Sequence, residues 1–545
     1  MFKKSNPEVQ ISLFNSAKEL LSEKSKKKFN DPNAWHNLFR NNVLSGIDEN
    51  HFSPLFNQGQ GAPNSSIRLL IGMMIIKESL QCSDKQLFEQ CEFNLLVRSA
   101  LGLINIDDPL PVESTYYLLR KRIYLYYRQT GEDLFARVFQ DITSKQIRKF
   151  EVSGSAIRMD SKLIGSNIAW YSRYELIHQS ISQFFKALSS EELQNKMKRK
   201  ELVALKELMN EEGHTVVYRS SKSELNQRME SFGPLIYRLL KIFKRNPYYE
   251  ALSRVFKEQY KSGDGQIKVR DKEEITSDSV QSPNDLDCSY RDKDGQKVRG
   301  YTVNITETCS PNQLNLITDV RTEKVNTPDT SFLIDSVKGT NTVTGQRVDK
   351  IHADGAYHSP ANNDFCICND IDMVLTGMQG YKGRYELNPF KNGLQVIDTL
   401  TGEILDAQRS AHSRNEKWCI KTESGYRYFG RKEINNSLIR KKLQSRTREE
   451  LQRRNNVEAT IFQLCFFTRN NKTRYRKLPN HKLWAYCRAL AINLSRIRTY
   501  METICQRTQD VSFAFIINTL SLWTKSLLEP NYLLKRHHNI VLSHY

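Results

Sequence analysis

The spacing of apolar and polar residues divides the chain into a helical part and a part with strands. Residues 1–150 have helical periodicity, and the apolar stretch at 67–80 predicts a mostly buried helix. Pro109 and Pro111 interrupt the pattern, and a further helix is expected from Ser114, with a hydroxyl side chain available as its N-cap. The first 150 residues are therefore predicted to form an all-helical N-terminal domain.

Strand-like patterns begin near residue 155. Five segments fit strands, namely 155–165, 299–308, 315–325, 349–357 and 371–377. A long helical stretch, roughly 172–262, separates the first two of them. After the fifth, Thr401-Gly402 and Ser424-Gly425 indicate hairpins, and helical spacing returns from Asn435. This order predicts one mixed α/β sheet with two insertions rather than several independent domains.

The chain carries a large excess of positive charge. Its 545 residues include 81 Lys and Arg against 61 Asp and Glu, which gives a formal net charge of +20 and a pI of about 9.3. This balance favours a polyanionic partner, either nucleic acid or an anionic membrane surface. Hydrophobic residues make up 39% of the chain, which indicates a globular protein rather than a disordered one.

Neither a membrane span nor a secretory signal is expected. The purest apolar run, Leu69–Ile76, has eight residues, whereas roughly 18–20 are needed to cross a bilayer. No apolar stretch follows Lys3 and Lys4 near the start. The ten cysteines include no pair of Cys-x-x-Cys units, which is typical of reduced thiols rather than a disulfide framework. A cytoplasmic location is the expectation.

Three carboxylates occupy positions where a charge is unusual. Asp160 lies inside the first predicted strand. Asp354 ends the fourth strand, at the carboxyl edge where open α/β sheets usually place their sites. Glu458 is the lone charge in a largely apolar helical run at 457–467. Because a charge buried without a partner is costly, each of these side chains is expected to have a cation nearby.

If the three side chains converge, they form an oxygen-only cluster of the kind that Mg²⁺ and Mn²⁺ prefer. Two such ions about 4 Å apart activate a water or a 3′-hydroxyl and stabilise the departing oxygen in phosphodiester cleavage. Arg454 precedes Glu458 by one helical turn and could orient its carboxylate or contact a phosphate. Two plainer interpretations stay open: Asp160 as an ordinary salt-bridge partner, and Arg454 with Glu458 as a simple i,i+4 pair.

Four segments occur in a fixed order along the chain. They are RMDSKLIGSNIAWYSRYELIH around Asp160, KIHADGAYHS around Asp354, RRNNVEATIFQL around Glu458 and the helical RALAINLSRI. Together they resemble the RNase H-like catalytic core of DDE-type insertion-sequence transposases. A stretch beginning SPLFNQGQGAPNSSIRLL is similar to the helical domain that precedes this core in many such transposases, so that the resemblance spans about residues 50 to 500.

The resemblance implies a catalytic triad of Asp160, Asp354 and Glu458 that holds two Mg²⁺ or Mn²⁺ ions. It implies a DNA transposase that cleaves double-stranded DNA at the terminal inverted repeats of its element and transfers the strands into target DNA, with a homodimer expected by analogy. The domains would be a helical DNA-binding domain at 1–150, an RNase H-like domain at 151–500 with a helical insertion at 170–285 and a β-rich insertion at 378–435, and a C-terminal helical tail at 501–545.

Basic residues gather in two places where DNA could bind. Residues 459–500 hold nine Lys or Arg and no Asp or Glu, which predicts a phosphate track beside the Glu458 helix. A helix at 116–128 interleaves tyrosines with basic residues. The DNA-binding candidates are Arg454, Lys472, Arg474, Arg476, Lys477, Arg120, Lys121 and Arg122. Related transposases carry a lysine where this chain has Cys465, and Lys472 or Arg474 are the available substitutes. A solvated basic face is the plainer alternative.

Other functions and another site stay open. A catalytically inactive DNA-binding or repressor derivative would keep the basic surfaces, and an RNase H-like nuclease would cleave without strand transfer. A rival zinc site would use His352, His358, Cys366 and Cys368. The Cys-x-Cys spacing is tight for two ligands of one tetrahedral zinc, which disfavours this site.

Overall fold

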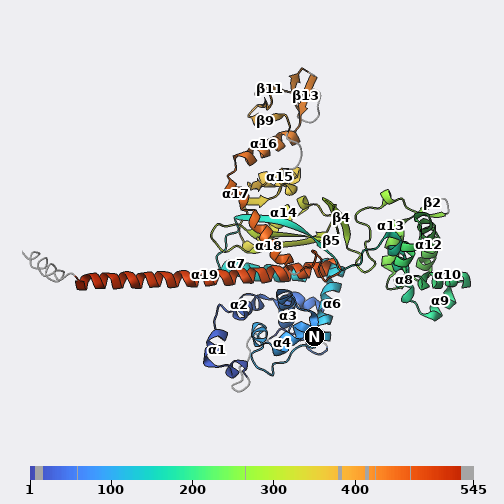
Figure 1. The fold of residues 1–545 in the computed structure, drawn as a ribbon, viewed down its shortest axis with the longest axis horizontal. Coiled ribbons are helices and arrows are strands. Elements are labelled where there is room, and N and C mark those ends of the chain that lie inside the picture. Colours follow the sequence, from blue (N-terminus) through green and yellow to red (C-terminus); the bar gives the residue numbers. More distant parts are fainter. Residues whose placement is uncertain are drawn as a thin grey trace, which may run out of the picture.

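The computed structural model describes residues 1–5, 16–57, 59, 61–263, 266–378, 383–410, 417–423, 425–466 and 468–528, with the side chains of the last helix described as far as residue 506. A mixed sheet lies at the centre, above a group of N-terminal helices, with a helical region on one side and a small antiparallel sheet projecting from the top (Figure 1). The fold is therefore mixed α/β with a helical N-terminal region, as predicted.

The described N-terminal residues form helices joined by loops, with one isolated bridge between Ser16 and Asn105. The α-helices are α1 (Glu23–Phe29), α2 (Trp35–Asn42), α3 (Ile67–Leu80), α4 (Asp84–Phe93), α5 (Leu95–Ala100), α6 (Glu113–Thr130) and α7 (Leu134–Lys149). The buried helix predicted at 67–80 is α3. The helix predicted from Ser114 is α6, which begins at Glu113. The predicted hydroxyl N-cap is wrong, because the N-cap is Val112, which offers no side-chain hydrogen bond. Instead, the negative charge of Glu113 in the first turn interacts favourably with the positive end of the helix dipole.

The central sheet has six strands. They are β1 (Ala156–Gly165), β4 (Ser289–Lys293), β5 (Gln296–Thr308), β6 (Ile317–Lys324), β7 (Lys350–Ala353) and β8 (Asp372–Leu375). The strand order is β4-β5-β1-β7-β8, with β6 also pairing with the long β5. Strands β1, β7 and β8 run parallel, whereas β5 is antiparallel to β1. All five predicted strands are present, and β4 is an addition whose charged sequence SYRDK has no apolar pattern.

Helices cover both faces of this sheet. On one face, Ile157 and Met159 of β1 are fully buried against Leu333 of α14 (Leu333–Thr344). Side chains of α15 (Pro360–Cys368) belong to the same hydrophobic cluster. On the other face, Ile305 of β5 packs with Ile461 of α18 (Asn455–Cys465) and with the first half of α19 (Leu478–Leu528). The helix α19 runs without a break past residue 501, between the sheet and the N-terminal helices (Figure 1).

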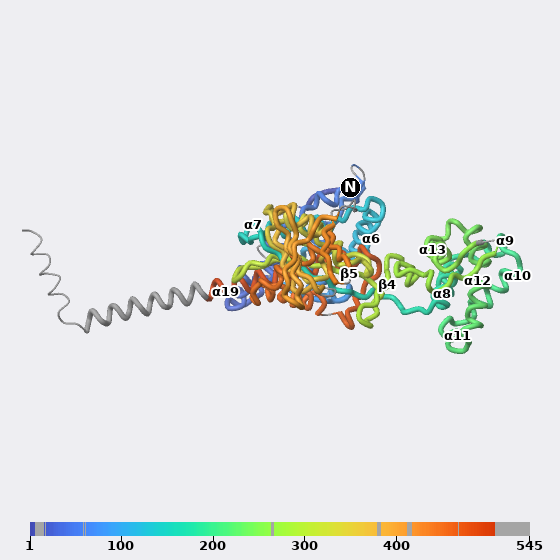
Figure 2. Tube along the Cα trace, turned by 90° about the horizontal axis from the view of Figure 1, so that it is seen from above, coloured from blue at the N-terminus to red at the C-terminus, as the bar shows by residue number. Residues whose placement is uncertain are grey.

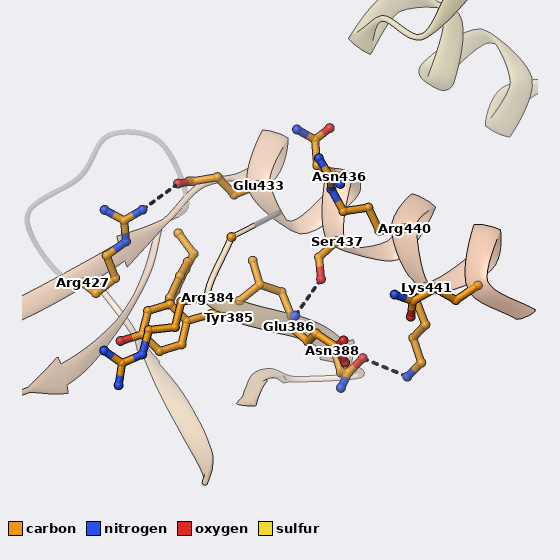
Figure 3. Close-up of a pocket in the computed structure, with 14 residues that line it drawn as sticks. Arg384, Tyr385, Glu386, Asn388, Arg427, Glu433, Asn436, Ser437, Arg440 and Lys441 are labelled. Carbon is orange, nitrogen blue, oxygen red and sulfur yellow. Dashed lines mark hydrogen bonds and ion pairs between the residues drawn. The ribbon is translucent and has the colours of Figure 1, made fainter. Parts of the chain in front are cut away.

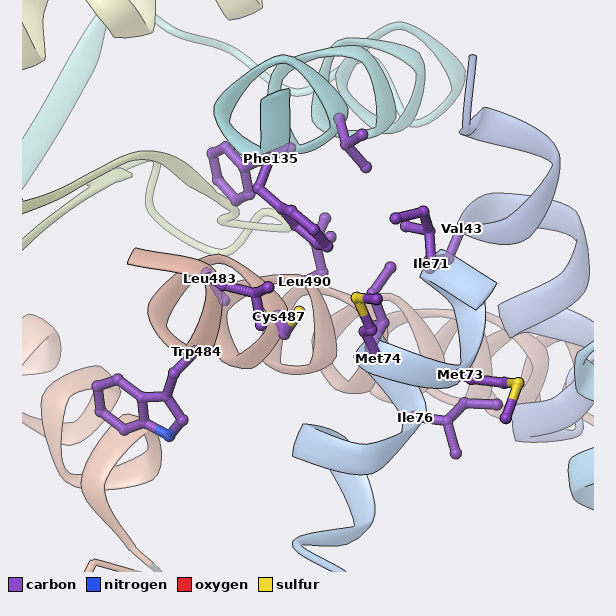
Figure 4. Close-up of a cluster of buried hydrophobic side chains, with 14 of the residues drawn as sticks. Val43, Ile71, Met73, Met74, Ile76, Phe135, Leu483, Trp484, Cys487 and Leu490 are labelled. Atoms are coloured by element: carbon purple, nitrogen blue, oxygen red, sulfur yellow. The ribbon is translucent and has the colours of Figure 1, made fainter. Parts of the chain in front are cut away.

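The N-terminal helices and α19 share one hydrophobic core. Met74 of α3 and Phe135 of α7 lie beside Leu483, Cys487 and Leu490 of α19 (Figure 4). Because α19 also packs on β6, this core joins the N-terminal region to the central sheet.

A separate helical region is inserted between β1 and β4. It comprises α8 (Arg173–Lys186), α9 (Ser190–Lys196), α10 (Arg199–Asn210), α11 (Gly213–Arg219), α12 (Lys222–Ile242), α13 (Tyr249–Gln259) and the hairpin of β2 (Tyr260–Gly263) and β3 (Gln266–Val269). Serine and glutamate form capping boxes at the starts of α8, α9 and α12. The region has its own apolar core around Ile177, Ile236 and Leu252, and lies to one side of the sheet (Figures 1 and 2).

A second sheet precedes the Glu458 helix. Its strands are β9 (Tyr385–Phe390), β10 (Gly393–Asp398), β11 (Ile404–Arg409), β12 (Trp418–Thr422) and β13 (Gly425–Phe429), paired in the order of the chain. The hairpin predicted at Thr401-Gly402 joins β10 to β11; Ser424 lies outside the described residues, although β12 and β13 pair. Helices α16 (Arg431–Ser445) and α17 (Arg448–Gln452) then lead to α18.

The second sheet rests on α16. The Ser437 hydroxyl accepts a hydrogen bond from the Leu387 amide at 2.8 Å, and Lys441 donates to Asn388 at 3.0 Å (Figure 3). A cavity of about 390 Å³ lies between α16 and β9.

In the described part of the chain, no helix is long and apolar enough to cross a membrane.

Candidate functional site

Asp160 lies on β1, and Asp354 directly follows β7, the parallel neighbour of β1. The register of β1 and β7 pairs Ala156 with Lys350 and Arg158 with His352. The pairing ends there; Asp160 lies two residues beyond Arg158, and Asp354 lies two residues beyond His352. Adjacent strands are about 4.8 Å apart, so the two acidic residues are neighbours across the sheet.

Asp354 is placed by a turn at the end of β7. It is the N-cap of a short 3₁₀ turn at Gly355–Tyr357, and its carboxylate accepts a hydrogen bond from the Ala356 amide. The turn stops the strand, so that the side chain stands at the carboxyl edge of the sheet, where the sequence predicts it.

Glu458 joins this pair through Arg454. The Arg454 guanidinium donates from Nη2 to Asp160 Oδ2 at 2.8 Å and from Nη1 to Glu458 Oε1 at 2.7 Å. Arg454 directly precedes α18, which packs against β1 and β5. The i,i+4 pair between Arg454 and Glu458 is therefore present, but the same guanidinium also holds the acidic residue of β1. Asp160 and Glu458 thus share one cation, and Asp354 lies near enough to affect the pKa of both Asp160 and Arg454.

The electrostatics of the cluster reflect burial and crowding. Burial raises the pKa of Asp160, Arg454 and the Ser161 amide oppose this rise, and the nearby Asp354 adds to it. Burial lowers the pKa of Arg454, but Asp160, Glu458 and Asp354 outweigh it and raise that pKa above its usual value. Three carboxylates against one guanidinium leave a surplus of negative charge when all are ionised.

The donor chemistry of the cluster fits a hard divalent cation. Carboxylate oxygens are what Mg²⁺ and Mn²⁺ prefer, and the Arg454 guanidinium occupies the place between Asp160 and Glu458 as a resident cation. Among the described residues, no group of three or more His, Cys, Asp and Glu side chains stands close enough together to hold a metal ion.

The described residues give no support to the rival zinc site. The His358 ring bonds to the amide of Asn363 at 2.9 Å. Cys366 is buried, which raises the pKa of its thiol to about 11, whereas Cys368 is exposed. All ten cysteines are free.

A buried ionic network, which sequence reasoning missed, supports the acidic cluster. Glu307 of β5 is completely buried, and its carboxylate accepts from Arg158 Nε at 2.5 Å and from Arg496 Nη1 at 2.7 Å. The Thr460 hydroxyl of α18 donates to the same carboxylate at 2.8 Å. One side chain thus ties together β1, β5, α18 and α19. The charge near the end of the alternating strand pattern at 299–308 was the signal that could have revealed it.

The predicted basic residues at 472–477 form a turn that is attached to the end of β1. The Gly165 amide donates to the Asn471 carbonyl at 2.8 Å, and the Thr473 amide donates back to the Gly165 carbonyl at 3.0 Å. The buried carboxylate of Asp285 accepts from the Lys477 amide at 2.9 Å. Lys477 has a positive φ of 71°, a conformation that this amide contact helps to hold.

The basic side chains of this turn already have partners within the protein. Arg474 donates to the carbonyls of Gln81 and Cys82, and Arg476 donates to that of Asn167. Lys472 donates to the Ile168 carbonyl at 2.8 Å. The Lys477 ammonium lies 4.8 Å from the centre of the Tyr124 ring. Arg474, Arg476 and Lys477 are nevertheless exposed at the surface.

A groove of about 810 Å³ brings the two predicted basic segments together. Arg120 and Lys121 of α6 line it opposite the turn at 474–477, and the start of α13 with the residues before it (247–251) and the segment at 283–287 close it from the helical insertion. Arg120 packs against Tyr116 and Tyr475, which leaves 19% of its side chain exposed. Arg122 lies elsewhere, over the ring of Phe56.

Comparison with known proteins gives one match. Residues 27–122 match a family described as "Transposase domain (DUF772)". No curated protein and no solved structure matches the chain. The match runs from α1 into α6, which borders the groove, and supports a transposase role with DNA as a partner. It ends before the strands that carry Asp160 and Asp354.

Proposed function

We propose that the chain is a DNA transposase whose catalytic centre comprises Asp160, Asp354 and Glu458. The observation that carries this proposal is the position of Asp160 on β1 and of Asp354 at the end of the neighbouring β7, with Arg454 linking Asp160 to Glu458. The transposase-domain match at 27–122 supports the class of protein independently, because it covers none of these residues.

The sheet supports an RNase H-like core in this proposal. Its centre combines parallel β1, β7 and β8 with an antiparallel β5, and helices cover both faces. The helical insertion follows β1, and the second sheet precedes the Glu458 helix, which is the arrangement that the resemblance implies.

Asp160, Asp354 and Glu458 would hold two Mg²⁺ or Mn²⁺ ions. Such ions, when bound, lower the pKa of an attacking water or 3′-hydroxyl and stabilise the departing oxygen of the phosphodiester. The protein itself positions the catalytic side chains and the DNA. Arg454 holds Glu458 towards β1, Glu307 fixes α18 on the sheet, and the groove beside Lys121 and Lys477 attracts the DNA backbone.

The test is strand cleavage and strand transfer with divalent cations. The substrate is duplex DNA copied from the sequence that flanks the gene, supplied both intact and with precut 3′ ends. We expect Mg²⁺-dependent nicking and joined products, and we expect Asp160→Asn, Asp354→Asn and Glu458→Gln to abolish both while DNA affinity stays near that of the unmodified protein. Full activity in any one variant removes that residue from the centre.

The two other functions have distinct outcomes in the same assay. A DNA-binding or repressor derivative binds the duplex and cleaves nothing with any divalent cation. A nuclease without strand transfer cleaves the intact duplex but gives no joined product from the precut ends.

A further inference from the structure

A cavity of about 1000 Å³ lies where the helical insertion joins the edge of the central sheet. Its wall combines the start of α8, one side of α12, the segment at 269–281, the edge strand β4 and its neighbour β5. It shares no lining residue with the basic groove, and none of the three carboxylates of the proposed centre lines it. Its chemistry is therefore separate from that of the proposed DNA path.

Two half-buried arginines give this cavity positive charge without a matching carboxylate. Arg173 of α8 donates to the side chain of Gln259 at 2.7 Å and to its carbonyl at 3.1 Å. Arg299 of β5 donates to the Tyr171 carbonyl at 3.1 Å, while its Nε is buried and has no hydrogen-bond partner among the described residues. Neither guanidinium forms an ion pair with a described carboxylate, so neutral acceptors alone hold both groups.

The acids near these arginines compensate their burial only in part. Burial lowers the pKa of Arg173 and that of Arg299. Asp271 and Glu274 oppose the lowering for Arg173, but both carboxylates pair with Lys261, at 3.4 and 3.2 Å. A buried cation without a carboxylate is stabilised by an anion that binds beside it.

The other charged residues of the wall are exposed, and they carry both signs. They are Lys222, Glu230, Asp271, Lys272 and Glu273, together with the half-buried Arg270, which has Glu274 at 3.9 Å. The positive charge that lacks a partner is therefore concentrated at Arg173 and Arg299.

Aromatic rings flank Arg299. The register of β4 and β5 pairs Tyr290 with Arg299, so the two side chains are direct neighbours on one face of the sheet. Tyr290 and Tyr171 both line the cavity. The Arg299 guanidinium also lies 4.7 Å from the centre of the Trp170 ring, which borders it from the other strand of the connection to α8. A flat ring can thus stack beside the guanidinium.

The deeper part of the wall is apolar. Leu176, Met229 and Val280 line the cavity and are buried. The volume is at the upper end of the range of about 300–1,000 Å³ that is typical of small-molecule sites. Guanidinium groups bind phosphate oxygens through paired hydrogen bonds, and tyrosine rings offer a face for a planar ring. A small ligand with a phosphate and a flat ring matches all of these features.

We infer that this cavity binds a nucleoside monophosphate, with its phosphate on Arg173 and Arg299 and its base against Tyr290. The inference goes beyond the proposed function, since it needs neither DNA nor the three carboxylates.

The experiment is isothermal titration calorimetry on the full chain. The probes are AMP, GMP, CMP and UMP, each compared with its own nucleoside and with inorganic phosphate. We expect at least one mononucleotide to bind at least tenfold more tightly than its nucleoside, because hydrogen bonds between charged groups contribute about that factor or more.

Two substitutions separate the two halves of the ligand. Arg299→Gln should weaken the mononucleotide by about tenfold and leave the nucleoside unchanged. Tyr290→Leu should weaken the mononucleotide and leave inorganic phosphate unchanged, whereas Tyr290→Phe should keep the affinity. The matched control is Arg291→Gln: Arg291 is also half-buried on β4 and donates to the Thr327 carbonyl at 3.3 Å, but it does not line the cavity. It should leave the affinity unchanged.

Three results overturn the inference. They are failure of the unmodified protein to bind any of the four mononucleotides, equal effects of Arg299→Gln and Arg291→Gln, and a twelve-nucleotide single-stranded DNA that binds through Arg299 when no mononucleotide does. The last result assigns the cavity to the DNA backbone. If Arg299→Gln does not fold, as judged by thermal melting, the effect of Tyr290→Leu on the mononucleotide decides. None of these results bears on the cleavage and strand-transfer assay, so the proposed function is tested separately.

Discussion

Arg454 and Asp160 are 294 residues apart in the sequence and form an ion pair of 2.8 Å at the centre of the molecule. Only 13% and 16% of their side chains are exposed, so the pair is mostly withdrawn from water. Because Arg454 also binds Glu458, this contact fixes α18 relative to β1.

Arg454→Gln should therefore destabilise the protein by about 3 kcal/mol, since it leaves Asp160 buried without its cation. Urea unfolding followed by circular dichroism measures this loss. The matched control is Arg498→Gln, which breaks the exposed i,i+4 pair with Glu502 and should cost less than about 1 kcal/mol. Equal losses in the two variants would show that the central pair contributes no more than a surface pair.

Divalent cations should stabilise the folded protein through the same cluster. A cation that binds only the folded chain raises its stability by about 2.7 kcal/mol at 100 times its dissociation constant. Thermal melting with and without Mg²⁺, or with Ca²⁺ to avoid catalysis, measures the shift. Asp160→Asn should abolish the shift, and Asp335→Asn, on an exposed carboxylate of α14, should retain it. A full shift in Asp160→Asn would place the cation elsewhere.

The elements that carry the site were predictable because their patterns are local. The alternation around Asp160 and the short apolar run before Asp354 are enough to identify β1 and β7. The hydrophobic pattern does not specify which strands are neighbours, so the proximity of Asp160 and Asp354 could be found only from the observed pairing of β1 with β7. Strand β4 was missed because charged residues dominate it.

Contacts between distant segments could not be predicted from the sequence, for the same reason. Glu307 meets Arg158, Thr460 and Arg496, which come from three other elements, and no spacing rule connects them. The predicted basic residues at 472–477 were found from composition alone. Composition did not reveal that the Arg474 guanidinium binds backbone carbonyls.

Glu307→Gln should be among the most destabilising single changes in the sheet. It removes one charge from a buried carboxylate that serves two guanidinium groups, which leaves Arg158 and Arg496 without full compensation. We expect a loss of about 3–5 kcal/mol in the free energy of unfolding. Glu323→Gln is the control, because its carboxylate on β6 is 44% exposed and pairs loosely with Lys482 at 3.6 Å. A loss below that of the control would exclude a role for Glu307 in holding α18.

The groove should contribute to the salt dependence of DNA binding through Lys121 and Lys477. These cations line it from α6 and from the basic turn. Neutralising a lysine that binds one phosphate lowers the slope of log K against log salt by about 0.9, so Lys121→Gln with Lys477→Gln should flatten it by almost 2. Lys338→Gln, on an exposed part of α14, should leave the slope unchanged. An unaltered slope in the double variant would mean that DNA does not pass through the groove.

Acid should destabilise the protein through His481, which lies under the basic turn. The ring is buried; Nδ1 donates to the Lys477 carbonyl at 3.0 Å, and Nε2 accepts from the Thr473 hydroxyl at 2.9 Å. Burial lowers the pKa of His481 to about 4. The unfolded chain, with a pKa near 6.5, therefore binds the proton first, so the contribution of this group is complete above pH 6.5 and is lost as the pH falls towards 4.

Between pH 7 and pH 5 this loss amounts to roughly 2 kcal/mol. His481→Gln removes the titrating group, so its free energy of unfolding should fall less steeply over that interval than that of the unmodified protein. His214→Gln, at a residue whose side chain is 72% exposed, should keep the original pH dependence. Urea unfolding at a series of pH values measures both slopes, and parallel curves for His481→Gln and the unmodified protein would contradict the assignment of the acid loss to His481.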